Sequence, residues 1–156
     1  MKSNWKHTLA IWYFGLTKIP MIFFTRPRVH ILDDDICQIM IPLKRRSKNH
    51  LKRMYIGNLV VGADLAAGLF ALKIIKEQDQ KISLIFKDMK AIFYKGVDAD
   101  ALFSCRQADV IRSLVQKVIA TGERHHETVS IEVTAPELYG DEIMAEFSLT
   151  LSLKVK

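Results

Sequence analysis

The stretch between Arg53 and Lys73 constrains the fold of this chain most, because Asp64 is its only charged residue. Its apolar residues lie on nearly every side of a helix, which is typical of a helix enclosed by protein. The stretch therefore predicts a central helix over about residues 57–76. Small residues that would let a curved sheet approach closely are Gly57, Gly62, Ala63, Ala66, Ala67 and Gly68. Since an unpaired buried carboxylate is expensive, Asp64 calls for an explanation.

The same stretch is long enough to span a bilayer. Against this interpretation, Asp64 at its midpoint would cost roughly 3 kcal/mol on insertion scales. A second apolar stretch, residues 8–24, is similar to a signal peptide but is interrupted by Lys18 and Pro20. We therefore expect no integral membrane segment, and we predict that residues 1–25 form a helical extension, ending near Pro20, that packs on the domain.

Length and composition indicate a single domain. The chain has 156 residues, of which 49% are apolar and 26% charged, an ordinary globular balance. Cys37 and Cys105 are far apart and form no C-x-x-C pair, as expected of buried thiols in a reducing compartment. We therefore expect a cytoplasmic protein.

Strict alternation of apolar and polar residues marks strands in the second half of the chain. Residues 146–155 and 128–135 both alternate, and the PELYGD segment between them predicts a hairpin turn. Residues 82–94 predict a long strand with a bulge near Lys87 and Asp88. We expect the KGVDAD segment to turn this strand back into a partner strand over residues 101–107.

The remaining segments complete an α+β pattern. Residues 108–122 have the periodicity of an amphipathic helix. Residues 28–32 and 36–44 flank three aspartates and predict another antiparallel pair. One domain over residues 26–156, with a mostly antiparallel sheet around the central helix, is the economical arrangement.

This order of elements resembles the hotdog fold of acyl-CoA thioesterases and hydratases. Phenylacetyl-CoA-type hotdog thioesterases carry Asn, then His-Gly-Gly beginning six residues later, then an acid nine residues after that His. Here Asn49 matches the Asn, Tyr55-Ile56-Gly57 stands in place of His-Gly-Gly, and Asp64 matches the acid. The resemblance implies a curved sheet wrapped around the central helix and an acyl-CoA thioesterase activity.

The resemblance also implies roles for the helix start and the acid. The backbone N–H groups of Ile56 and Gly57 would polarise the thioester carbonyl, and Asp64 would act as base or nucleophile. Asn49 could orient a water molecule or simply cap a turn. We expect Tyr55 to be an aromatic residue of the interface or the substrate pocket and not an acid catalyst.

Two further expectations concern the substrate. Many such enzymes place Ser or Thr on the following strand, where Ser83 is the nearest candidate and Phe86 is an equally good match in register. Coenzyme A would be part of the substrate, and we expect no separate cofactor and no metal. The adjacent His125 and His126 would point to opposite faces of a strand and could not chelate together.

A basic run precedes the central helix. Six cations fall within ten residues that contain no acid: Lys44, Arg45, Arg46, Lys48, Lys52 and Arg53. Of these, Arg45, Arg46 and Arg53 would suit the phosphates of coenzyme A, although a solvated loop explains the run equally simply. We expect no nucleic acid, because no stacking aromatics accompany the run.

The spacing of Gly57 and Asp64 bears on assembly. Seven residues of helix separate them by about 10 Å, so one helix cannot bring both groups to one carbonyl. In the resembled family a two-fold dimer does so, and we expect a homodimer, possibly paired further into a tetramer. Three alternatives stay open: a structural Asp64 at a dimer interface, a hotdog protein that binds acyl-CoA without hydrolysing it, and peripheral membrane association through the N-terminal helix and the basic run.

Overall fold

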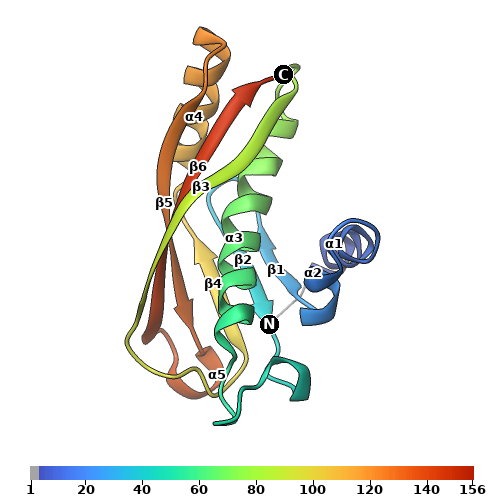
Figure 1. The fold of residues 1–156 in the computed structure, drawn as a ribbon, viewed down its shortest axis with the longest axis vertical. Coiled ribbons are helices and arrows are strands. Elements are labelled where there is room, and N and C mark those ends of the chain that lie inside the picture. Colours follow the sequence, from blue (N-terminus) through green and yellow to red (C-terminus); the bar gives the residue numbers. More distant parts are fainter. Residues whose placement is uncertain (1–3) are drawn as a thin grey trace.

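The computed structural model describes residues 4–156 as one antiparallel sheet curled around a long helix (Figure 1). Its six strands lie in the order β1-β2-β4-β5-β6-β3. The elements are α1 (Trp5–Thr17), α2 (Pro20–Thr25), β1 (Arg28–Leu32), β2 (Cys37–Ile41), η1 (Arg45–Ser47), α3 (Ile56–Lys76), β3 (Ile82–Phe93), β4 (Ala101–Cys105), α4 (Ala108–Thr121), β5 (His125–Thr134), α5 (Pro136–Tyr139) and β6 (Ile143–Val155). The expected α+β architecture with a central helix is confirmed.

The central helix α3 forms the core with the concave face of the sheet. Ala63, Ala66 and Phe70 are fully buried on it. A Cβ built on Gly62 would stand 2.3 Å from the ring of Phe103 in β4, so only a glycine allows this approach of helix and strand. Although α3 is long and apolar enough to cross a membrane, 67% of that stretch is buried inside the protein, as expected of a core helix.

The expected local strand features are present. The pairs β1–β2 and β5–β6 are antiparallel, and β3 has a register shift between Phe86 and Asp88, where the bulge was predicted. Inward-facing Phe147, Leu149 and Leu151 of β6 are fully buried, in keeping with their alternation in the sequence.

One predicted pairing is wrong: residues 82–94 and 101–107 do not form a hairpin. β3 instead pairs with β6 at the edge of the sheet, from Ile82 opposite Val155 to Phe93 opposite Ala145. β4 lies between β2 and β5, and the connection through Gly96 crosses from the edge strand to the middle of the sheet. A turn signal in the sequence marks a change of chain direction but does not specify which strand the next strand will pair with. β4, which is buried along its whole length, takes a place inside the sheet between β2 and β5.

The extension expected over residues 1–25, of which residues 1–3 lie outside the described part, forms two helices where one was expected. The reason is that Pro20 begins α2 instead of only ending α1. A backbone contact joins them: a Cβ on Gly15 would stand 2.6 Å from the backbone nitrogen of Phe23. The pair is held to β1 by hydrogen bonds, in which Val29 N donates to Thr8 Oγ1 (2.9 Å) and Trp12 Nε1 donates to the Pro27 carbonyl (2.7 Å).

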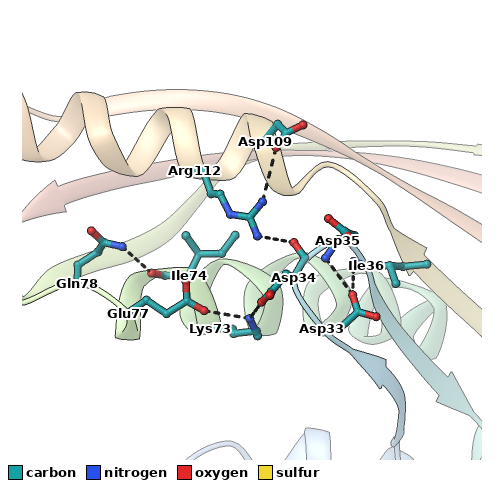
Figure 2. A network of polar contacts seen from close by, with 10 residues as sticks. All are labelled: Asp33, Asp34, Asp35, Ile36, Lys73, Ile74, Glu77, Gln78, Asp109 and Arg112. Carbon is teal, nitrogen blue, oxygen red and sulfur yellow. Dashed lines mark hydrogen bonds and ion pairs between the residues drawn. The ribbon is translucent and has the colours of Figure 1, made fainter.

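The turn between β1 and β2 is fastened to two helices by polar contacts (Figure 2). Asp33 Oδ1 accepts hydrogen bonds from the backbone of Asp35 and Ile36, both at 2.9 Å, which stabilises the turn. Lys73 of α3 pairs with Asp34 at 2.6 Å and lowers the pKa of that carboxyl group. The side chain of Arg112 in α4 donates to the Asp34 carbonyl. These contacts are exposed to solvent, which screens them, so they position the turn more than they stabilise the fold.

Candidate functional site

The start of α3 has two unpaired backbone donors. Tyr55 is the N-cap residue, and its carbonyl accepts from Asn58 N (2.9 Å) and Leu59 N (3.3 Å), but its side chain caps nothing. Within residues 4–156 the N–H groups of Ile56 and Gly57 have no acceptor. A helix of 21 residues adds its positive dipole end at this point, so the two groups are suited to hold an oxyanion or a carbonyl oxygen.

The preceding loop positions this helix start through backbone hydrogen bonds. Tyr55 N donates to the Ser47 carbonyl (2.8 Å), and the Asn58 side chain donates to the same oxygen (3.0 Å). Met54 N donates to the Val97 carbonyl (2.7 Å), which ties the loop to the segment after β3. The helix start is therefore fixed from both sides.

Asn49 organises the loop itself. Its Oδ1 accepts from Leu51 N (2.9 Å) and Arg53 N (3.1 Å), and Lys52 takes a left-handed conformation with φ of 62° in the same turn. Two roles were open for Asn49, orienting a water molecule or capping a turn. Its side-chain oxygen serves the turn. Its backbone N–H donates to the Arg53 carbonyl (2.7 Å), and its side-chain nitrogen Nδ2 has no partner within the described part of the chain.

A pocket of about 500 Å³ opens beside the helix start. The loop and helix side contributes Asn49, Arg53, Tyr55 and Ile56, and the opposite wall is built by Phe93, Tyr94, Lys95, Gly96 and Val97. Apolar side chains dominate this lining, and Arg53 and Lys95 add positive charge. The arrangement suits a ligand that combines an apolar part with anionic groups.

Arg53 lies flat against Gly96 across the pocket. A Cβ on Gly96 would stand 2.4 Å from Arg53 Cδ and 2.7 Å from its Nη1. The glycine therefore makes room for the guanidinium group on the pocket wall.

Asp64 lies outside this pocket, on the side of α3 that faces β3. Its Oδ1 is beside Gly68, where a Cβ would be 3.9 Å away, and the ring of Phe86 reaches the same glycine at 3.5 Å. The carboxyl group is half-buried, and within residues 4–156 it has no hydrogen-bond or ion-pair partner. Burial alone raises the pKa of Asp64.

The other predicted site residues are dispersed. Ser83 Oγ donates to the Lys154 carbonyl (3.1 Å) at the beginning of β3, and Ser83 does not line the pocket. Arg45 and Arg46 are exposed in η1, also outside the pocket. Of the two residues considered on the strand after the central helix, Phe86 is the one that approaches Asp64.

Sequence reasoning missed the wall formed by residues 93–97. Tyr94 donates to Glu146 Oε2 at 2.7 Å, which raises the pKa of the tyrosine, and Lys95 forms an ion pair with Glu142. These side chains reach the helix start because β3 pairs with β6, a long-range contact that has no local signal. Within residues 4–156 no group of three or more His, Cys, Asp or Glu side chains is placed to hold a metal ion.

Comparison with known proteins decides the family. The model of the domain of unknown function DUF4442 matches residues 10–152. The chain belongs to the DUF4442 family. A search of curated proteins finds no match for it.

Solved structures with similar folds extend this result. A Pseudomonas aeruginosa protein of unknown function, described as a probable thioesterase, is 21% identical with a TM-score of 0.77, covering 96% of each chain. A Chlorobaculum tepidum protein of unknown function is 12% identical, covers 99% of this chain and 98% of its own, and has a TM-score of 0.81. A thioesterase from Haemophilus influenzae is 12% identical over 92% and 88% of the two chains, with a TM-score of 0.68. At these identities the likeness shows a shared fold: this DUF4442 chain has the hotdog fold of thioesterases.

Proposed function

We propose that this DUF4442 protein hydrolyses acyl-CoA thioesters at a site shared between the two copies of a homodimer. The observation that carries the proposal is the pair of unpaired N–H groups, of Ile56 and Gly57, at a helix start beside a pocket of about 500 Å³. Oriented backbone donors of this kind stabilise the oxyanion of acyl-transfer reactions. The fold shared with thioesterases supports the same reaction class.

In the proposed reaction the thioester carbonyl oxygen accepts hydrogen bonds from these two N–H groups. Water adds to the carbonyl carbon, the carbon–sulfur bond breaks, and coenzyme A leaves as the thiol with the free acid as second product. Asp64 takes the proton from the attacking water and returns it to the departing sulfur. Its raised pKa makes it a stronger base than an exposed aspartate.

A second copy is needed because the two groups are far apart in one chain. Gly57 and Asp64 are separated by about 10 Å along the helix. The long edge strand β3 supports pairing, since its inward-facing Met89 and Phe93 are exposed although their cross-strand neighbours are buried. A two-fold partner placed along this edge would cover them and bring its own helix start towards Asp64.

Arg53 and Lys95 are the proposed contacts for the phosphates of coenzyme A, which is part of the substrate. Both line the pocket, whereas Arg45 and Arg46 do not. The two free, buried cysteines are compatible with a reducing cytoplasm, where acyl-CoA esters are made and used.

The test is thiol release from a panel of acyl-CoA esters, with oligomeric mass measured in parallel. Asp64→Asn should remain dimeric and lose roughly a hundredfold or more in rate, the scale of a positioned base. Asp79→Asn is the matched control, because Asp79 is exposed and makes no hydrogen bond or ion pair within residues 4–156. If Asp64→Asn and Asp79→Asn hydrolyse the panel equally fast, Asp64 is not the base.

A non-catalytic acyl-CoA binding protein is the second candidate. It is favoured by the ring of Tyr55, which lies over Gly57 at the start of the helix and restricts the approach of an acyl group. Saturable binding of acyl-CoA without any released thiol, unchanged by Asp64→Asn, would establish this function instead.

A further inference from the structure

The outward face of α1 is apolar. Four side chains at helical spacing, Trp5, Leu9, Tyr13 and Leu16, form one exposed stripe along it. Met21 and Phe24 of α2 are exposed as well. Together these six side chains make up the N-terminal apolar surface.

The opposite face of α1 already packs on the domain, where Thr8, Ile11 and Gly15 are buried. A helix that only covers a domain has polar residues on its solvent side. α1 is apolar on both sides, so its outer stripe is not needed for the core of this chain. Apolar residues grouped this closely on a surface mark a site of interaction.

Positive charge surrounds this surface. The described chain contains no Asp or Glu before Asp33, whereas Lys6, Lys18, Arg26 and Arg28 all precede it. η1, with the exposed Arg45 and Arg46, contacts α2 and extends the positive rim. The first part of the basic run, with Arg45 and Arg46, therefore lies next to the α2 side of the N-terminal apolar surface.

We propose that the N-terminal apolar surface docks on an anionic phospholipid bilayer. Helices that lie in the membrane interface combine exposed Trp, Tyr and Phe with Lys and Arg. Their aromatic rings lie at the level of the lipid headgroups, and their cations bind the lipid phosphates. Three of the six side chains are Trp5, Tyr13 and Phe24. The absence of acids from this part of the described chain removes the repulsion that an anionic surface would otherwise meet.

The place of the two helices favours a bilayer over a second copy of the chain. α1 and α2 stand out to one side of the molecule next to β1 (Figure 1), and β1 and β3 are the opposite edges of the sheet. The edge proposed for dimerisation is thus the other edge of the sheet from the one that carries α1. Neither the pocket beside the helix start nor the smaller one over β3, β5 and β6 is lined by these residues, so neither offers a groove there for a single protein helix.

Tryptophan fluorescence tests the proposal on the unmodified protein. The chain has two tryptophans, Trp5 and Trp12, and both lie in α1. With vesicles of phosphatidylglycerol we expect the emission to shift to the blue, and brominated phosphatidylglycerol to quench it. With vesicles of phosphatidylcholine, or at high salt, the change should be much smaller, because cation–lipid attraction is screened or missing.

A pair of variants isolates the surface. Leu9→Ser combined with Leu16→Ser removes two apolar side chains that are 58% and 61% exposed. The control is Leu138→Ser, which removes a leucine of similar exposure (59%) on α5. We expect the double variant to partition onto phosphatidylglycerol vesicles at least roughly tenfold less than wild type, and Leu138→Ser to behave as wild type. Thiol release from acyl-CoA in the absence of vesicles should be unchanged in both.

Three results would overturn the proposal. One is wild-type protein that stays with the supernatant when phosphatidylglycerol vesicles are sedimented. Another is equal vesicle binding by the double variant and Leu138→Ser. The third is a double variant with a smaller oligomeric mass by light scattering, since the covering partner would then be a second copy. If the double variant fails to fold, Lys6→Gln combined with Lys18→Gln replaces it, because both are exposed cations of α1 and its C-cap. This second variant must then lower vesicle binding.

Discussion

The ring of Tyr55 lies against Gly57 at the start of the central helix: a Cβ built on Gly57 would stand 2.6 Å from Cε1 of that ring. Tyr55 is otherwise exposed, so the contact holds a solvent-facing side chain across the helix start. The ring beside it, and not an unusual backbone conformation, is what favours glycine here, since the φ of Gly57 is not positive.

Replacement of Gly57 by alanine should therefore act through Tyr55. Because an exposed ring can swing aside, we expect Gly57→Ala to cost no more than about 1 kcal/mol of unfolding free energy. In a Tyr55→Ala background the same replacement should cost less, with a coupling of about 0.5 kcal/mol or more between the two sites. Urea unfolding of the four proteins measures this cycle, and strictly additive effects would contradict it.

Two glycines of α3 should respond oppositely to alanine. At Gly62 the new methyl group would stand 2.3 Å from the buried ring of Phe103, so Gly62→Ala should destabilise the fold by about 1–3 kcal/mol. At Gly68 the nearest atom, on Phe86, would be at an ordinary 3.5 Å, and the helix propensity of alanine should stabilise by up to about 1 kcal/mol. Thermal or urea unfolding of the two variants would show the contrast. Equal effects would mean that the close approach at Phe103 is not rigid.

The edge strand β3 offers a direct test of assembly. Met89 (41% exposed) faces inward opposite Leu149, whereas Ile92 (43% exposed) is on the other face of the strand. Met89→Lys should convert the proposed dimer to monomers, because it places a charge where the partner helix would pack, and Ile92→Lys should leave a dimer. Light scattering at micromolar concentration distinguishes these outcomes. A wild-type protein that is already monomeric would refute the shared site as well.

The raised pKa of Asp64 predicts a pH-dependent stability. Burial makes the folded-state pKa higher than the unfolded one, so the fold favours the protonated carboxyl group. The stability associated with that proton is present at acid pH and is lost as the pH rises through the folded-state pKa. Asp64→Asn should thus have a higher free energy of unfolding than the parent at neutral pH. The difference between the two proteins should become smaller as the pH is lowered. Unfolding in the Met89→Lys background tests this without a partner; a constant gap at all pH values would contradict it.

The sequence was most informative where a pattern reports burial directly. The apolar stretch around Asp64 predicted α3 within one residue at its start, and period-two alternation located β5 and β6. The bulge before Asp88 was also predicted, because charged residues interrupt an apolar strand there. These features depend on neighbours along the chain.

Features that depend on distant residues were not predictable in the same way. The KGVDAD turn gave no information on which strand β4 would join, so the pairing of β3 with β6 was missed. As a result the pocket wall from Phe93 to Val97 was missed too. Four predicted site residues line one pocket because they are close in sequence: Asn49, Arg53, Tyr55 and Ile56. Asp64 and Ser83, which were assigned to the same site, lie outside that pocket within one chain.

The position of β6 between β5 and β3 determines when the sheet can be completed during synthesis. β3 ends at Phe93, yet its partner β6 begins only at Ile143, with Ile82 opposite Val155. During synthesis β3 must wait, with its apolar side chains uncovered, until the residues of β6 emerge. Such late, long-range pairing slows folding and exposes nascent chains to aggregation. A variant that lacks residues 153–155 would leave Ile82 and Leu84 at the beginning of β3 without their cross-strand neighbours, so shortening β6 should expose an apolar edge and not merely trim the sheet.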